Sequence, residues 1–380
     1  MNSFERVVNA FHGRKADKIP VFHIGFSSQV ASRILGHEAY IGGGIQQWRE
    51  ATALWNGSEA HREYLEQSYE DAFEIAKICD MDIVRTSYWR LAQKPAKKIN
   101  VNEFLYGDEN NWVIRKFHPE TELFVVTASY PTKKEVTFDD IEQLLDKQEK
   151  RLPEYDPSAG FDAIKAAFKV FGRDKALRAN AGHIDIPMES IWLEAICLRP
   201  DLIQRHLDLQ VRKAVININY LSTLGIRMIF GGGDLASNSG PIYSPETFRS
   251  YLLPAVRRIS EACHLHNMYY LYCSDGNLWP IAEDLFGSSG VDGYYEIDRR
   301  AGMDLDKLRI QFPNLTLIGA NISSYTLHKG SKEDVIAESR SCIEAAKKYG
   351  KIVVGCSNYL VPGTPVENAW AMIETIDKYR

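Results

Sequence analysis

Short apolar runs alternate with longer stretches of helical periodicity along most of the chain. The runs lack the strict apolar–polar alternation of a sheet with one wet face, so they predict strands covered on both faces, as in parallel sheets. Eight runs are expected as strands: residues 19–25, 81–87, 176–182, 226–233, 268–274, 292–297, 315–321 and 352–357. Eight strands alternating with helices predict an α/β fold of the (β/α)8 TIM barrel type.

Helical patterns fill the intervals between these runs. They are expected at residues 58–79, 187–197, 200–223, 245–266, 277–285, 303–311, 332–349 and 365–379. Ser244 and Thr364 each precede a proline, which is a favoured residue at the first position of a helix. Both residues are therefore predicted to cap the helices that follow them.

One region departs from the alternation. Residues 95–136 contain the stretches KKINVNEFLYG, NWVIRKF and ELFVVTASY, which are typical of a small antiparallel meander. Its place in the chain makes it an excursion after the second strand, where it could shape the mouth of the barrel. We therefore expect one barrel domain over residues 1–380, with an insertion at about 95–136.

Composition and charge narrow the class of protein. The chain has 380 residues, 45% hydrophobic and 25% charged, which is enough for a large core. The net charge of -5 and the lack of a long basic run argue against a nucleic-acid partner. No apolar run is long enough to span a membrane or to form a secretory signal. The six cysteines show no framework spacing, so they are expected to be free thiols in a reducing cytoplasm.

The carboxyl ends of the predicted strands carry residues suited to chemistry. In a barrel of this type the reacting groups gather at that end. The positions there hold His23, Arg85, Tyr88, His183, Asp234, Cys273, Asp275, Glu296, Asn321 and Cys356. Two thiolates, a carboxylate and an imidazole such as His183 would suit tetrahedral Zn²⁺, and three protein ligands suffice for a catalytic site. The alternative is that Cys273 and Cys356 act only as small buried hydrophobic residues.

Several of these residues admit other roles. His183 could contact substrate, bind a metal or only hydrogen-bond the backbone. Asp234 follows three glycines in GGGDLASNSG, which matches no phosphate-binding fingerprint, so it could face a cavity or cap the next segment. Tyr88 and Trp89 could form an apolar wall for a flat ligand, or pack in the core.

Five segments resemble the uroporphyrinogen decarboxylase superfamily. They are FERVVNAFHGRKADKIPVF at the start, GGGDLASNSGPIYSPETFRSYLLPAVRRI in the middle, and YLYCSDGNLWPIAEDL, GVDGYYEIDRRAGMDLDKL and GCSNYLVPGTPVENAWAMIETI in the last third. The resemblance is strongest from residue 226 onward. It implies a (β/α)8 barrel with extra N-terminal helices. It also implies one of two chemistries: cofactor-free decarboxylation of a tetrapyrrole, or zinc-dependent methyl transfer from a methylated corrinoid protein to a thiol.

Departures from the family patterns favour the second chemistry. The decarboxylases carry an arginine-bearing motif after the first strand and a histidine after the last. Here the first strand leads into HIGFSSQVASRIL, and Cys356 stands at the place of the histidine. The thiol methyltransferases carry His-x-Cys after the fifth strand and a cysteine after the eighth. Cys356 fits the latter position, whereas the fifth strand ends in Cys273-Ser274-Asp275.

The resemblance therefore implies a zinc-dependent thiol methyltransferase with Cys273, Cys356, Asp275 and Glu296 as candidate ligands. Its partners would be a small-molecule thiol or methylated substrate and a corrinoid protein. The remaining candidates are Asp234, His183 and Tyr243 for catalysis, and His23, Arg85, Tyr88 and Asn321 for substrate binding. Two alternatives stay open: a metal-free enzyme acting on a tetrapyrrole or small methoxylated compound, and a non-catalytic corrinoid- or tetrapyrrole-binding barrel.

Overall fold

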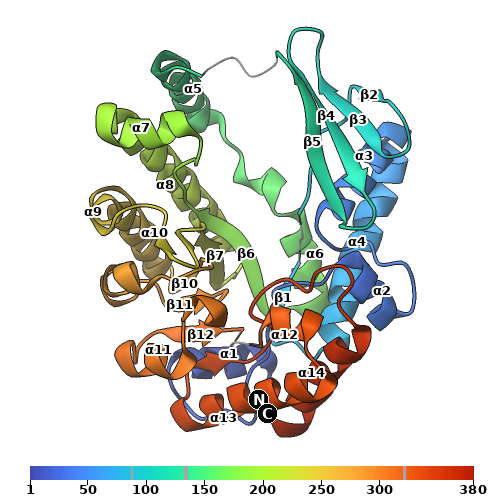
Figure 1. Cartoon of the computed structure of the whole chain (residues 1–380), viewed down its shortest axis with the longest axis vertical. Coiled ribbons are helices and arrows are strands. Elements are labelled where there is room, and N and C mark those ends of the chain that lie inside the picture. The colour runs from blue at the N-terminus through green and yellow to red at the C-terminus, as the bar shows by residue number, and fades with distance from the viewer. Residues whose placement is uncertain (87–88, 132–135, 320–321) are drawn as a thin grey trace.

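The computed structural model describes residues 1–86, 89–131, 136–319 and 322–380. Seven parallel strands form one curled sheet (Figure 1). In spatial order they are β1 (Ile83–Arg85), β6 (Ala176–His183), β7 (Met228–Gly232), β10 (Tyr269–Cys273), β11 (Gly293–Tyr295), β12 (Thr316–Ile318) and β13 (Ile352–Val353). Each strand lies within one of the predicted runs or extends one residue beyond it. The α/β class and the TIM-like arrangement are thus confirmed. Among the described residues the sheet does not close into a complete barrel, because β1 and β13 are its two edges and do not pair with each other.

The run at residues 19–25 was expected as the first of eight strands, and this expectation is wrong as stated. The segment lies in the gap between β1 and β13, where Val21 forms a single parallel bridge with Val354. On its other side the Asp82 N–H donates to the Val21 carbonyl over 2.8 Å. Continuous pairing fails because Pro20 has no N–H to donate. It fails also because the Cys356 N–H donates to Nδ1 of His23, 3.2 Å away.

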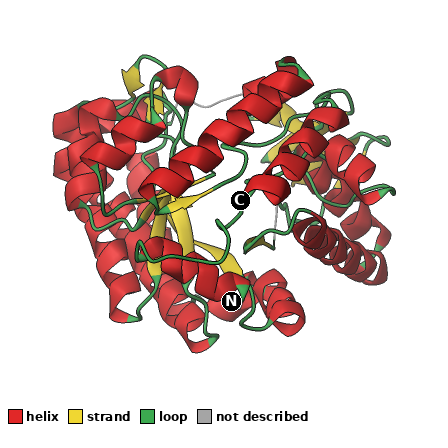
Figure 2. Ribbon diagram, turned by 90° about the horizontal axis from the view of Figure 1, so that it is seen from below, coloured by secondary structure: helices red, strands yellow, loops and turns green. Residues whose placement is uncertain are grey.

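Helices surround the parallel sheet, as Figure 2 shows from below. The longer ones are α1 (Ser3–Phe11), α3 (Gly44–Asn56), α4 (Ser58–Ile78), α5 (Phe138–Arg151), α6 (Asp162–Phe171), α7 (Ser190–Leu198), α8 (Pro200–Thr223), α10 (Leu253–Leu265), α13 (Lys332–Tyr349) and α14 (Val366–Tyr379). Shorter ones are α2 (Ser28–Leu35), α9 (Pro245–Thr247), α11 (Leu305–Gln311) and α12 (Ser324–Lys329). Among the described residues, none of these helices combines the length and apolarity that crossing a bilayer requires.

The two predicted helix starts have different outcomes. Ser244 caps α9 as expected, since its side chain accepts from the Thr247 N–H over 3.0 Å and Pro245 takes the first position. The helix then continues through a π-helical turn into α10. Thr364 does not cap α14, because that helix begins one residue later, at Val366. Its hydroxyl instead lies 3.2 Å from Nδ1 of His328.

A packed layer of side chains fills the inside of the curled sheet. The Arg178 guanidinium lies over the rings of Phe230 and Tyr295, at 4.4 and 5.4 Å from their centroids. The two rings are 4.8 Å apart, and Phe22 packs against Phe230 at 5.6 Å. A cation over aromatic faces in a dry interior is stabilising. This layer forms the floor of the site that lies above it.

The antiparallel excursion expected at about 95–136 is confirmed. Its strands are β2 (Lys97–Lys98), β3 (Glu103–Gly107), β4 (Trp112–His118) and β5 (Leu123–Tyr130), paired in that order. Figure 1 shows this sheet standing against α3. It has a small core of its own, in which Trp48 of α3 stacks on Phe117 at 4.5 Å. The buried Glu122 ties it to α2 by accepting from the N–H groups of Ser28 and Gln29, both over 2.8 Å.

Candidate functional site

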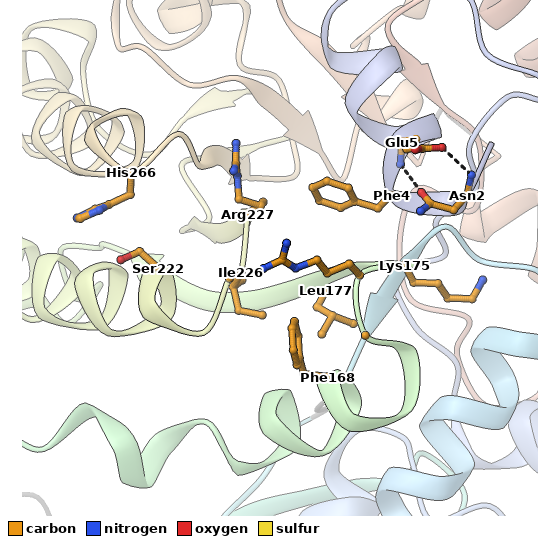
Figure 3. Close-up of a pocket in the computed structure, with 13 residues that line it drawn as sticks. Asn2, Phe4, Glu5, Phe168, Lys175, Leu177, Ser222, Ile226, Arg227 and His266 are labelled. Atoms are coloured by element: carbon orange, nitrogen blue, oxygen red, sulfur yellow. Dashed lines mark hydrogen bonds between the residues drawn. The ribbon is translucent and has the colours of Figure 1, made fainter.

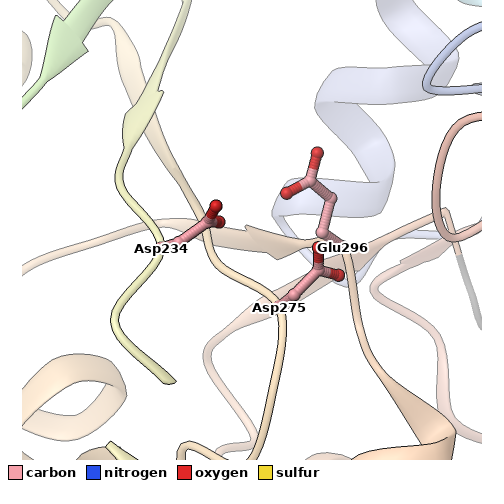
Figure 4. A group of neighbouring side chains, drawn as sticks. All are labelled: Asp234, Asp275 and Glu296. Carbon is pink, nitrogen blue, oxygen red and sulfur yellow. The ribbon is translucent and has the colours of Figure 1, made fainter. Parts of the chain in front are cut away.

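Three carboxylates meet at the carboxyl ends of neighbouring parallel strands. Asp234 follows β7, Asp275 follows β10 and Glu296 follows β11 directly. One oxygen from each lies within 4.8 Å of the other two (Figure 4). Because β7, β10 and β11 are adjacent in the sheet, their ends necessarily converge there. Oxygen atoms at this spacing can share a single divalent cation.

The backbone segments that carry these carboxylates lie very close to one another. Gly232 has φ of 114°, and a Cβ there would lie 2.3 Å from the carbonyl oxygen of Cys273. The next N–H, of Gly233, donates to that same carbonyl over 3.2 Å. Glu296 adopts a left-handed φ of 67°, which is unusual for a residue with a side chain. Strain of this kind costs about 1–3 kcal/mol and gathers at functional sites.

Cys273 and Glu296 form a hydrogen-bonded pair. The Cys273 thiol donates a short hydrogen bond to Oε2 of Glu296. Burial raises the pKa of the thiol well above its usual value, and the negative charge of Glu296 raises it further. Burial likewise raises the pKa of Glu296, while the guanidinium of Arg178 below opposes that rise. Without a cation, the pair therefore keeps its proton at neutral pH.

Asp275 has a pKa close to neutral pH. Burial raises its pKa to about 7, and the charges of Glu296 and Asp234 contribute to the rise. Asn358 counteracts it, because its Nδ2 donates to both carboxylate oxygens over 3.0 and 2.9 Å. A carboxylate that titrates near 7 can exchange a proton with a substrate under physiological conditions.

Cys356 lies next to this group but not in it. Its side chain is fully buried, and its Sγ donates to the carbonyl of Asn358 over 2.7 Å. Burial raises the pKa of the thiol to about 12, although the N–H groups of Ile24 and Gly25 act in the opposite direction. Among the described residues, the group whose ligand atoms all lie within 4.8 Å consists of the three carboxylates alone. A metal-binding role for Cys356 stays a prediction.

Comparison with known proteins finds a family that resembles the part of the chain holding this site. Residues 191–379 match the sequence model of the uroporphyrinogen decarboxylase (URO-D) family. The chain is similar to that family over these residues, which make up just under half of its length. The matched part contains all three carboxylates and both of the cysteines considered above. No curated protein sequence matches the chain.

The fold of the whole chain is shared with a solved structure. A methyltransferase from Methanosarcina mazei superimposes with a TM-score of 0.65 at 20% sequence identity. The alignment covers 100% of this chain and 99% of that one. At this level of identity the likeness establishes a common fold.

The other predicted residues that the structure describes lie outside the carboxylate group. His183 ends β6 with its side chain 67% exposed, and its Nε2 lies 3.7 Å from Oδ1 of Asp185. Tyr243 is buried and donates to the Ile186 carbonyl, and burial raises its pKa to about 12. Both candidates therefore contact the segment after β6. Arg85 donates to the carbonyl of Ile24. Tyr88 and Asn321 lie outside the described residues.

His23 faces away from the packed layer inside the sheet. It lines a separate cavity of about 330 Å³ together with Cys79 and Trp370. Its ring is 1% exposed and packs edge-on against Phe26 at 5.7 Å. Burial lowers its pKa to about 3, so the imidazole is neutral. The role of His23 in substrate binding stays a prediction.

Two residues that contact or support this site were not among the candidates. Asn358 holds Asp275, and it stands two positions after Cys356 in the loop that follows the last strand. Arg178 supports Glu296 from below. A signal for it exists in the sequence, because a charged residue in the middle of the apolar run ALRANAG is costly to bury unless it is paired.

Proposed function

We propose that this protein is a metal-dependent methyltransferase that moves a methyl group from a methylated corrinoid, carried by a partner protein, to a small thiol. The observation that carries the proposal is the approach of Asp234, Asp275 and Glu296 within 4.8 Å at the mouth of the sheet. Carboxylates this close repel one another unless they hold protons or a cation. The family match and the shared fold support an enzyme of this class.

The donor set fits zinc. The three carboxylates alone would suit Mg²⁺ or Mn²⁺ as well, but the thiol of Cys273, which hydrogen-bonds Glu296 from outside the group of three, would add a softer sulfur ligand if it turned toward the ion. Zinc accepts both kinds of donor. Bound zinc would lower the pKa of an incoming thiol and so keep it as a thiolate at neutral pH. Cys356, whose sulfur donates to the Asn358 carbonyl, is the alternative candidate for the sulfur ligand, and comparison of the two cysteine variants decides between them.

The surrounding residues have defined tasks in this proposal. Asp275 would be one of the ligands of the ion, which would hold its carboxylate in the charged form, and the proton of the acceptor thiol would leave to solvent. Asn358 fixes the orientation of that carboxylate through its two hydrogen bonds. Arg178 offsets the charge of Glu296. The thiolate sulfur forms the new bond to the methyl carbon, and the electron pair of the broken cobalt–carbon bond stays with the corrinoid. His183, exposed at the end of β6, is proposed to contact the substrate.

Metal content and methyl transfer together test the proposal. Purified protein is expected to hold about one zinc per chain by elemental analysis, and to demethylate methylcobalamin when a thiol such as 2-mercaptoethanesulfonate is supplied. Glu296→Gln and Asp275→Asn should lose both zinc and transfer. Glu261→Gln, at an exposed position of α10, is the matched control and should keep both.

Three outcomes would overturn it. Zinc that remains stoichiometric in an Asp275→Asn, Glu296→Gln double variant would place the metal elsewhere. Metal-free protein that decarboxylates uroporphyrinogen would establish the decarboxylase alternative. Protein that binds cobalamin tightly and transfers nothing would establish a binding role instead.

A further inference from the structure

A second cavity lies at the opposite end of the parallel strands from the carboxylates. Its volume is about 420 Å³, within the range of small-molecule sites. Its walls come from the start of α1, the end of α6, the end of α8 and the residues that lead into β6 and β7 (Figure 3). Leu177 near the start of β6 and Ile226 just before β7 mark this end of the sheet.

The walls of this cavity carry more positive than negative charge. Arg173, Lys175 and Arg227 line it together with His266, and Glu5 is the acid among the lining residues. The Glu5 carboxylate already accepts from the N–H of Asn2 over 3.0 Å, as part of the cap of α1. An anion could therefore enter without displacing a counter-ion from the arginines.

Two of these cations have no side-chain hydrogen bond or ion pair with the residues that the structure describes. The Nε atom of Arg227 is buried and lacks a hydrogen bond. Figure 3 shows this side chain between His266 and Phe4. Within the described part of the chain, Arg173 likewise forms no side-chain hydrogen bond or ion pair. Lys175, by contrast, donates to the Met81 carbonyl over 2.6 Å. A buried donor without an acceptor costs free energy, which a ligand oxygen would recover.

Helix ends do not account for this charge. The carboxyl ends of α6 and α8 face the cavity, and each offers a partial charge of about -0.5. The two helix ends together supply about one negative charge. The guanidinium groups of Arg173 and Arg227 carry two positive charges, so a net positive charge remains in the cavity. The lining also has an apolar part, which includes Phe168, Leu177 and Ile226. A ligand that fits both parts of the lining needs an anionic group and an apolar body.

We propose that this cavity binds a small organic anion, a carboxylate or phosphate carried on an apolar ring or chain. Arg173 and Arg227 bind the anionic group, because one guanidinium can donate two parallel hydrogen bonds to two oxygens of a carboxylate or phosphate. Phe168 and Leu177 contact the apolar body. The site is separate from the three carboxylates, so the ligand is neither the methyl donor nor the thiol acceptor proposed above.

Titration calorimetry and thermal unfolding on the full chain test this site. Phenyl phosphate and benzoate are the probes, and inorganic phosphate and benzyl alcohol represent the two halves of the ligand. We expect both probes to bind and to raise the melting temperature, since a ligand of the native state stabilises it. Each half alone should bind at least about tenfold more weakly.

Charge-removing variants identify the residues involved. An Arg173→Gln, Arg227→Gln double variant should weaken binding of phenyl phosphate by about tenfold or more, since hydrogen bonds to charged groups contribute that much. Arg212→Gln, at an exposed arginine of α8, is the matched control and should bind as the parent does. If the double variant fails to fold, Arg173→Gln alone, at an exposed position, gives the same comparison.

The proposal is overturned if neither probe binds, if the arginine variants bind phenyl phosphate as tightly as the parent, or if inorganic phosphate binds as tightly as phenyl phosphate. Zinc content should be the same with and without phenyl phosphate. This readout separates the anion site from the metal site, because the failure of either one leaves the other unchanged.

Discussion

At the scale of single residues, the proposed chemistry depends on where one proton resides. The Cys273 thiol donates its proton in a hydrogen bond to Glu296, and burial raises the pKa of Asp275 to about 7. A metal ion must displace protons from whichever of these groups it binds. The same environment that makes the site reactive therefore makes its affinity for metal depend on pH.

Zinc affinity should fall as the pH drops through about 7, the raised pKa of Asp275. Below that pH the carboxylate is protonated and binds cations poorly, whereas above it the charged form is available. Removing the Asn358 side chain removes hydrogen bonds that lower this pKa, so Asn358→Ala should move the midpoint to higher pH. Affinity measured with a zinc indicator from pH 5.5 to 8.5 checks this. A midpoint that stays near the ordinary pKa of an aspartate would contradict it.

The two cysteines should respond differently to replacement. Cys273→Ser removes the sulfur beside Glu296 and should weaken zinc binding by about tenfold or more, since serine is a poor zinc ligand. Cys356→Ser keeps a small group that can still donate to the Asn358 carbonyl, so zinc should be retained. Elemental analysis of both variants after identical dialysis measures the effect. Equal loss of zinc from both would instead restore Cys356 as a direct ligand.

The residue scale also shows what the sequence can and cannot predict. Asp234, Cys273, Asp275 and Glu296 were predicted candidates, because the carboxyl ends of barrel strands converge and these residue types stand there. The contact between Cys356 and Asn358 was not foreseen. It depends on how the loop after β13 folds back, and no periodicity encodes that path.

At the scale of elements, the sheet was predictable where strands are continuous and not where a side chain interrupts them. Seven apolar runs became strands, since burial on both faces selects such runs. The run at 19–25 has the same composition, but the ring of His23 occupies a position in the ladder. Thr364 failed as a cap for a related reason: Pro365 could stand before the helix as easily as at its first position.

Gly232 tests the close contact between β7 and β10. A methyl group at Gly232→Ala would lie 2.3 Å from the Cys273 carbonyl, at a φ that side chains disfavour. We expect a loss of unfolding free energy of about 2–4 kcal/mol and a loss of zinc, because Cys273 must move. Gly160→Ala, where no atom lies within 4 Å, should change stability by less than about 0.5 kcal/mol. Urea unfolding of both variants provides the measurement, and equal stability would show that the contact relaxes freely.

At the scale of the whole molecule, the two ends of the parallel strands have separate tasks. The carboxyl ends gather acidic groups and a thiol, and the amino ends border a cavity rich in arginine. The packed layer around Arg178 and Phe230 lies between them. The antiparallel sheet β2–β5 is an insertion in the barrel. It could be predicted because its sequence departs from the alternation of strands and helices. How this sheet is joined to the rest of the molecule was not predictable. The join depends on single side chains, such as Trp48 against Phe117 and Glu122 at the start of α2, whose partners no periodicity encodes.

Glu122 should control how firmly the antiparallel sheet is held. Its carboxylate accepts from two N–H groups at the start of α2, where the helix dipole also favours a negative charge. Glu122→Ala leaves those donors without a protein acceptor, so β2 to β5 should exchange their amide hydrogens faster while β6 and β7 stay protected. Hydrogen exchange resolved by segment measures this, with Glu120→Ala, two residues earlier and exposed, as the control. If Glu122→Ala instead accelerates exchange equally in β6 and β7, the antiparallel sheet unfolds only together with the barrel and Glu122 has no local role.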